Sequence, residues 1–128
     1  MSYTYSKVSD LENSEMVGNH QCVALVRKFA GAPPTLAWKQ GAAVFGNSSL
    51  KKGTAIATFV NGKYANMNHG NHAALYMGQT PDGIRVMDQW KTKKVKFISS
   101  RTIHSKGKTK SGAYIRPSDN ADAFFVIE

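Results

Sequence analysis

The spacing of apolar residues changes near residue 53, and this change constrains the fold more than any other feature of the sequence. Before it, apolar side chains recur at the intervals of one helix face, at Cys22, Leu25, Val26 and Phe29. After it, short runs rich in β-branched and aromatic residues alternate with turn signals such as Asn61-Gly62. Helical segments followed by consecutive strands are typical of an α+β domain.

The expected elements are one helix, a second short helix and about five strands. Asn19 can cap a helix that begins at His20, and Gly31 followed by Pro33-Pro34 ends it. We expect the short helix at residues 35–40. The strands are expected at residues 54–60, 72–77, 84–90, 95–98 and 123–127. The remaining long segments are expected to be an irregular arm at residues 1–17 and a flexible basic loop at residues 106–112.

Length and hydropathy point to one domain over residues 1–128. The chain has 128 residues, 41% of them hydrophobic, which is enough to build a core. No run approaches the roughly 20 apolar residues of a membrane span. Residues 1–10 are polar and lack the apolar centre of a secretion signal. We therefore expect no classical secretion signal.

The sequence contains a single cysteine, Cys22, so no disulfide can form within the chain. A thiolate nucleophile needs a lowered pKa, a base within reach and donors for an oxyanion. In the first turn of a helix, the free N–H groups and the helix dipole stabilise a thiolate. Cys22 occupies that position if Asn19 is the cap, and its own backbone N–H would then be the natural oxyanion donor.

A base and an orienting group are expected on the following strands. His72 opens an apolar strand after a polar loop, which places an imidazole at a sheet edge that a helix start can face. Across the turn at residues 81–83, early residues of one strand oppose late residues of the next, so His72 and Asp88 should be neighbours. Asp88 shares its face with Ile84 and Val86, whereas Gln89, our second candidate for the orienter, points the other way.

Other interpretations of these residues compete with catalysis. A lone cysteine is often a small buried hydrophobe, and a lone histidine is often a surface or core residue. Asp88 can cap a turn or pair with a lysine. The combination of Cys22 at a helix start, His72 on a strand and Asp88 on the partner strand is what favours catalysis.

Metal binding is not favoured, and we expect neither a metal nor another cofactor. His69 and His72 are three residues apart and His20 precedes Cys22, but no HExxH or CxxC pattern is present. His69 is instead expected to shape its loop or to touch substrate. Asn19 and His20 are further candidates for substrate contact.

The charge is strongly basic and uneven. Lys and Arg number 17 against 8 Asp and Glu, which gives +9 and favours acidic partners such as nucleic acid, anionic cell wall or an acidic protein. Residues 91–110 hold eight Lys or Arg and no acidic residue. No nucleic-acid motif accompanies this run, and a solvated basic face is its commoner meaning. Nucleic acid is therefore not the favoured partner, but a non-catalytic basic module that binds nucleic acid or an acidic partner remains the alternative.

Four segments resemble motifs of the CHAP and NlpC-type peptidoglycan hydrolases. Residues 18–23 (GNHQCV) resemble their nucleophile motif, and residues 70–78 (GNHAALYMG) resemble their histidine motif. Residues 86–90 (VMDQW) resemble the strand of the third catalytic residue, and residues 53–57 (GTAIA) resemble the strand before the histidine loop. The resemblance implies a papain-like α+β fold, with N-terminal helices packed on an antiparallel sheet of about five strands. It implies Cys22 as nucleophile, His72 as base and Asp88 as orienter.

Within that superfamily, the small size and the polar N-terminus resemble the type VI secretion amidase effectors. The resemblance implies an antibacterial toxin, made in the bacterial cytoplasm and active in the periplasm of a target cell. It also implies a cognate immunity protein that blocks the active site. The substrate would be a peptide of peptidoglycan, with the D-Ala–diaminopimelate crosslink favoured and the γ-D-Glu–diaminopimelate bond second.

Overall fold

The computed structural model describes residues 2–128; Met1, the first residue of the predicted arm, lies outside them. The described part has one α-helix, four short 3₁₀-helices and six strands. In chain order these elements are η1 (Val8–Leu11), α1 (Cys22–Ala30), η2 (Thr35–Ala37), β1 (Gln40–Ala43), β2 (Ala55–Thr58), β3 (Ala73–Thr80), β4 (Gly83–Asp88), β5 (Ser99–His104), η3 (Pro117–Asp119), η4 (Ala121–Ala123) and β6 (Phe124–Ile127). The predicted α+β class is confirmed, with six strands instead of about five.

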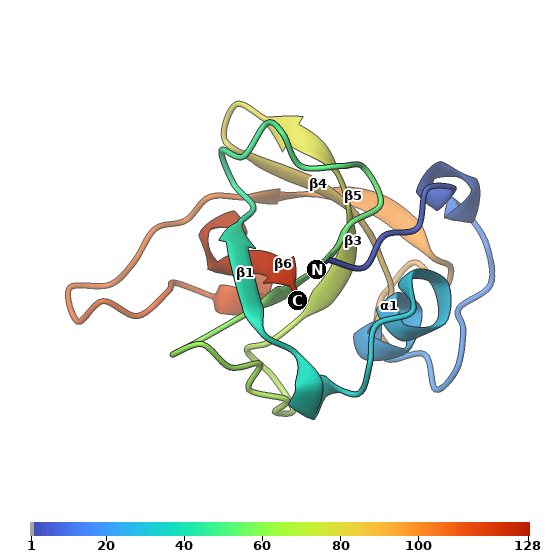
Figure 1. Cartoon of the computed structure of the whole chain (residues 1–128), viewed down its shortest axis with the longest axis horizontal. Coiled ribbons are helices and arrows are strands. Elements are labelled where there is room, and N and C mark those ends of the chain that lie inside the picture. Colours follow the sequence, from blue (N-terminus) through green and yellow to red (C-terminus); the bar gives the residue numbers. More distant parts are fainter. Residues whose placement is uncertain (1) are drawn as a thin grey trace.

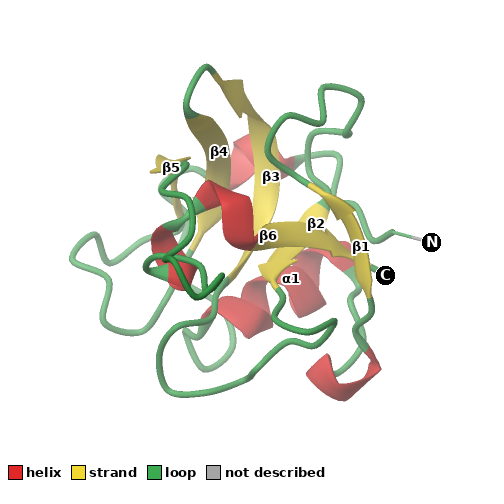
Figure 2. Ribbon diagram, turned by 90° about the vertical axis from the view of Figure 1, so that its left-hand side faces the viewer, coloured by secondary structure: helices red, strands yellow, loops and turns green. Residues whose placement is uncertain are grey.

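The six strands form one antiparallel sheet in the order β1-β6-β2-β3-β4-β5. Strands β2 to β5 follow the chain as a meander, as predicted, while β6 returns to pair between β1 and β2 (Figures 1 and 2). β1 was not predicted, because the segment QGAA is short, mostly exposed and without apolar alternation. It forms a strand because β6 offers it a partner.

Hydrophobic side chains cover both faces of this sheet. On one face, α1 buries Leu25 and Val26 against Leu75 of β3, and Figure 1 shows α1 lying beside β3. On the other face, Tyr76 and Phe124 belong to a second cluster. Successive residues of a strand point to opposite faces, so a fully buried strand carries apolar residues at every position. β2, near the middle of the sheet, is buried throughout and is apolar at Ala55, Ile56 and Ala57, whereas its last residue, Thr58, hydrogen-bonds to the His72 backbone.

The predicted start of the helix was wrong by two residues. The helix begins at Cys22, and its N-cap is Gln21, whose backbone is extended and whose side chain makes no capping bond. His20 has a φ of 68°, a left-handed conformation that cannot continue a right-handed helix. The Asn19 side chain accepts a hydrogen bond from the Gln21 N–H at 3.0 Å, so it organises the turn before the helix instead of capping it.

Other boundaries also differ from the prediction. The short helix is limited to Thr35–Ala37, because Gln40 already begins β1. The fourth predicted strand, at residues 95–98, lies later, at Ser99–His104. The N-terminal arm is partly ordered, since η1 buries Val8 and Leu11 in the core. None of the helices in residues 2–128 has the length and apolar character needed to cross a membrane.

Candidate active site

Cys22 is the first residue of α1, where the backbone N–H groups of the first turn have no partner within the helix. The segment before it is tightly held. Gly18 has a φ of 58°, and a side-chain carbon there would lie 2.9 Å from the Ala24 Cβ. Residue 18 must therefore be glycine for the chain to turn this closely into the helix.

Gln89 fixes this segment from the sheet side. It is fully buried, accepts from the Val17 N–H at 2.9 Å and donates to the carbonyl oxygens of Val17 and Gln21 at 3.0 and 2.9 Å. Gln89 does point away from Asp88's face, as predicted, but these bonds are to the helix start and not to the His72 ring. Gln89 therefore holds the backbone segment that leads into Cys22.

His72 and Asp88 are brought together across the β3–β4 hairpin. His72 Nε2 lies 2.8 Å from Asp88 Oδ2, and both side chains are buried. The His72 backbone is fixed to β2, where its N–H donates to Thr58 Oγ1 at 3.0 Å and its carbonyl accepts from the Thr58 N–H at 2.9 Å. The imidazole therefore has little freedom to rotate or shift.

Two cations surround the Asp88 carboxylate in addition to His72. Lys93 Nζ donates to Asp88 Oδ1 at 3.0 Å, and Arg101 Nε donates to Asp88 Oδ2 at 2.8 Å. Both cations also lie over the ring of Trp90, at 5.1 and 4.8 Å from its centroid, and that ring meets His72 edge-on. Burial raises the pKa of Asp88, but the hydrogen bond from His72 and the charges of His72, Arg101 and Lys93 outweigh it and hold that pKa well below its usual range.

The Cys22–His72 pair is electrostatically coupled. Burial raises the pKa of the Cys22 thiol, but the hydrogen bond and charge of His72, with smaller effects from Tyr64 and the backbone at Ala73, bring it below its ordinary value. Burial lowers the pKa of His72, but hydrogen bonds to Asp88 and Cys22 raise it to about 9. Because Nε2 is hydrogen-bonded to Asp88, Nδ1 is the ring nitrogen that is left to interact with Cys22. Both shifts favour a thiolate beside an imidazolium.

Two open hollows meet at Gln21 and Cys22. The first, of about 580 Å³, is lined by residues that include His72, Trp90 and Arg101. The second, of about 450 Å³, is lined by residues that include Arg27 and Tyr64. The loop carrying Met67, Asn68 and Asn71 lines both. Cys22 thus lies where the two hollows meet, with room on either side.

The remaining predicted candidates are placed around these hollows. His69 lines the first hollow and Asn19 lines the second, so both lie where a substrate would pass. His20 is not among the lining residues of either hollow. Within residues 2–128, no group of three or more His, Cys, Asp or Glu side chains is arranged to hold a metal ion.

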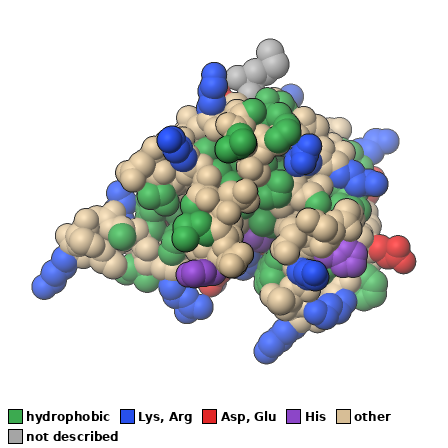
Figure 3. All heavy atoms as spheres, turned by 90° about the horizontal axis from the view of Figure 1, so that it is seen from below, with side chains coloured by type: hydrophobic (Ala, Val, Ile, Leu, Met, Phe, Trp, Pro, Cys, Tyr) green, Lys and Arg blue, Asp and Glu red, His purple; other side chains and the backbone are tan. Residues whose placement is uncertain are grey.

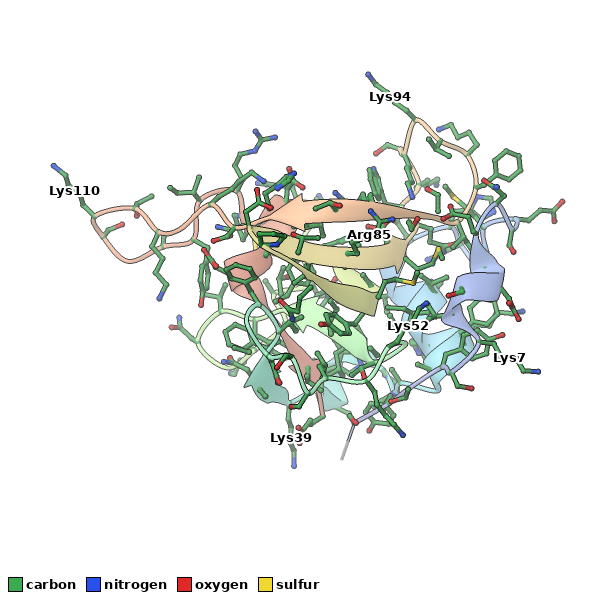
Figure 4. All side chains as sticks on the ribbon, turned by 90° about the horizontal axis from the view of Figure 1, so that it is seen from above. Lys7, Lys39, Lys52, Arg85, Lys94 and Lys110 are labelled. Atoms are coloured by element: carbon green, nitrogen blue, oxygen red, sulfur yellow. The ribbon has the colours of Figure 1, made fainter. Side chains whose placement is uncertain are left out.

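Four residues that contact the site were missed from the sequence. They are Tyr64, Asn71, Lys93 and Arg101. Lys93 and Arg101 belong to the basic run that we interpreted as a solvated face. In the structure Lys93 is 4% exposed, and a third member, Lys106, pairs with Asp119. Figure 4 shows that Lys94 and Lys110 lie at opposite ends of the molecule, so the run does not form one continuous basic face.

Comparisons with known proteins identify the family of the chain and its fold. The family model for domesticated amidase effector 2 matches residues 2–127. A type VI secretion amidase effector 2 protein of Salmonella typhi is 47% identical, with the whole of both chains covered. A domesticated amidase effector 2 of Ixodes scapularis is 37% identical over 88% of this chain and 73% of its own length.

The solved structure of a type 6 secretion amidase effector 2 (Tae2) superposes with a TM-score of 0.91. It is 47% identical, and the match covers 98% of this chain and 94% of that one. The predicted papain-like fold and the predicted resemblance to the secreted amidase effectors are both confirmed. This chain belongs to the domesticated amidase effector 2 family.

Proposed function

We propose that this chain is a cysteine amidase that hydrolyses peptide bonds of peptidoglycan, with Cys22 as nucleophile, His72 as base and Asp88 as orienter. The observation that carries the proposal is the connected Cys22–His72–Asp88 arrangement at the start of α1, open to a cleft. The relatives' names, which describe amidase effectors of type VI secretion, support the same reaction class.

The first half of the reaction forms a thioester. The Cys22 thiolate attacks the peptide carbonyl, and the negative charge moves to the carbonyl oxygen. The backbone N–H of Cys22, free at the helix start, donates to that oxygen. The tetrahedral intermediate then collapses, the C–N bond breaks, and the His72 imidazolium gives its Nδ1 proton to the leaving amine.

The second half consumes water. His72, now neutral, accepts a proton from a water molecule whose oxygen attacks the thioester carbonyl. The C–S bond breaks, the new carboxylic acid leaves and loses its proton to solvent, and the thiolate–imidazolium pair is restored. Throughout, Asp88 accepts the hydrogen bond from Nε2–H, which keeps Nδ1 directed at Cys22. Because Lys93 and Arg101 keep Asp88 ionised, this orienting bond is charge-assisted.

The cleft supports cleavage within a peptide chain. Hollows on both sides of Cys22 give room for residues before and after the scissile bond. Arg27 in one hollow and Lys91 in the other match the carboxylates of peptidoglycan stem peptides. We keep the D-Ala–diaminopimelate crosslink as the first candidate bond and the γ-D-Glu–diaminopimelate bond as the second.

The biological role proposed is that of an antibacterial effector delivered by type VI secretion and active in the target cell's periplasm. A cognate immunity protein would protect the producer by covering the Cys22 cleft. The basic binding module is not supported by a particular feature. On the face drawn in Figure 3, Lys and Arg side chains are scattered over the surface and its margin rather than gathered in one patch.

The test is digestion of purified Gram-negative peptidoglycan, with mass spectrometry of the released muropeptides. The wild type and the control His104→Ala, an exposed histidine paired with Asp82, should release product, whereas Cys22→Ala and His72→Ala should not. Loss of crosslinked dimers would identify the crosslink, and loss of stem peptides would identify the γ-D-Glu bond. Cleavage by Cys22→Ala, or none by the wild type, would overturn the proposal.

A further inference from the structure

A second hydrogen-bonded chain reaches the Cys22 sulfur, independent of the His72–Asp88 chain. Tyr64 Oη lies 3.7 Å from Cys22 Sγ. Asn71 Nδ2 donates to Tyr64 Oη at 3.0 Å, and the backbone N–H of Met67 donates to Asn71 Oδ1 at 2.7 Å. Each of these contacts lies within hydrogen-bonding distance, with the longer limit that sulfur allows.

These contacts fix the direction of each bond. A backbone N–H can only donate, so Asn71 must turn its oxygen toward Met67 and its NH₂ toward Tyr64. Tyr64 Oη then accepts from Asn71, and its own hydrogen is left to point elsewhere. The atom in range to receive it is Cys22 Sγ, which as a thiolate can only accept.

The Tyr64 ring is held in place for this contact. It is 9% exposed and packs on Trp38, with the ring centroids 4.8 Å apart. Trp38 is itself fixed, since its Nε1–H donates to the Pro33 carbonyl at 2.7 Å. Burial and the charge of Cys22 raise the pKa of Tyr64 well above its ordinary value, so the hydroxyl keeps the proton that it donates.

We propose that Tyr64 is a further catalytic residue, whose hydroxyl donates a hydrogen bond to the Cys22 thiolate, and that Asn71 is the positioning residue that sets its direction. This proposal rests on the proposed function, since it concerns the same nucleophile. Tyr64 lines the hollow that His72 does not, so the sulfur receives donors from two sides of the cleft. When a bound peptide displaces water, these two donors replace the solvation that the thiolate loses.

The first test measures Cys22 alkylation by iodoacetamide as a function of pH, without substrate. Cys22 is the sole cysteine, so every adduct reports on it. Tyr64→Phe removes the hydroxyl and keeps the ring. A hydrogen bond to a charged group is strong, so its loss should lower the alkylation rate about tenfold on the acidic limb of the profile. On the alkaline plateau, where the thiolate is complete in both proteins, the rates should converge.

Tyr76→Phe is the matched control. It also removes a buried hydroxyl with a hydrogen-bond partner, Gln79 at 2.8 Å, but in the second hydrophobic cluster. Its alkylation profile should match that of the wild type. A loss of packing at Tyr64 would instead alter the rate at every pH, which separates a structural role from the proposed one.

Asn71→Asp provides a second variant that does not disturb the ring. The carboxylate still accepts from Met67, but toward Tyr64 it can only accept, so the tyrosine hydrogen turns away from Cys22. The acidic limb should move to higher pH, partly through the added charge. In a Tyr64→Phe background the effect of Asn71→Asp should be smaller, because the hydroxyl that transmits it is gone.

The outcomes separate this proposal from the proposed function. A Tyr64→Phe profile that coincides with the wild type's, or equal effects of Asn71→Asp in both backgrounds, would overturn the role of Tyr64 and leave the amidase proposal intact. If Cys22 of the wild type alkylates only as fast as an ordinary thiol at every pH, the activated nucleophile itself is refuted, and both proposals fail.

Discussion

Replacing Asp88 by asparagine tests the electrostatic centre of the site. The substitution keeps the shape of the side chain and removes a charge that faces His72, Lys93 and Arg101. Asp88 is fully buried and Lys93 is 4% exposed, so Lys93 cannot recover this interaction from water. Breaking a buried ion pair by removing one partner costs about 3–5 kcal/mol.

This loss is measurable by thermal unfolding at pH 7, followed by circular dichroism. For a chain of this size, about 3–5 kcal/mol corresponds to a fall in Tm of roughly 10–20 °C. The matched control is Asp82→Asn, which removes the carboxylate 3.0 Å from His104, in a pair whose side chains are both more than half exposed. An exposed pair is worth little, so its Tm should stay within about 3 °C of the wild type's.

The pH dependence of this difference has a definite sign. The folded-state pKa of Asp88 lies below its unfolded value, so its contribution is complete above about pH 4 and is lost as the pH falls toward the folded-state pKa. The gap in unfolding free energy between wild type and Asp88→Asn should therefore narrow in strong acid. It should also narrow as the pH rises from about 6.5 toward 9, because Asp88 raises the pKa of His72 to about 9 and the stability gained from the protonated imidazole is lost over that range. Equal Tm values for Asp88→Asn and Asp82→Asn at pH 7 would refute this reasoning.

Three further predictions concern rate and packing. The kcat/KM of the wild type should decline as the pH rises through about 9, because His72 then loses the proton that it gives to the leaving amine. It should also decline in acid, because Cys22 is then protonated. A pH–rate profile measures both declines. Gln89→Ala should lower the free energy of unfolding by about 1–3 kcal/mol, because it removes the part-buried hydrogen bonds to the Val17 and Gln21 backbone. It should also lower kcat by releasing the helix start, and denaturation and kinetic assays measure the two effects. Leu25→Ala should cost about 2–5 kcal/mol in urea denaturation while Cys22 still alkylates, because it leaves a cavity under α1 without touching the site.

The parts of the fold that follow periodicity were predictable. Strands β2, β3, β4 and β6 lie where runs of apolar and β-branched residues predicted them, because their burial on both faces requires such runs. β1 has no such signal, since it is an edge strand whose existence depends on β6, a partner more than 80 residues away. The helix start was missed because the local turn places the His20 backbone in a left-handed conformation, and the spacing of apolar residues carries no signal for such a turn.

The candidate site also contains residues that the sequence predicted and residues that it did not. Cys22, His72 and Asp88 were accessible from the sequence because each opens or closes a regular element, and hairpin geometry relates two of them. Tyr64 was not, because it lies in a loop after a turn and reaches the sulfur only through packing on Trp38. The roles of Lys93 and Arg101 were hidden by their neighbours, since a run of basic residues does not say which cations turn inward toward a buried carboxylate.

The position of β6 inside the sheet, between β1 and β2, links the order of synthesis to the assembly of the candidate active site. β6 is the last strand to be made, yet it separates β1 from β2, and Phe124 at its start meets the His72 ring edge-on, with the ring centroids 6.3 Å apart. Pairings between residues so distant along the chain form late in folding. A nascent chain that stops before residue 124 has Cys22, His72 and Asp88 but lacks the strand that closes the sheet beside His72. A nascent chain therefore cannot complete the sheet beside Cys22, His72 and Asp88 until translation has passed this strand.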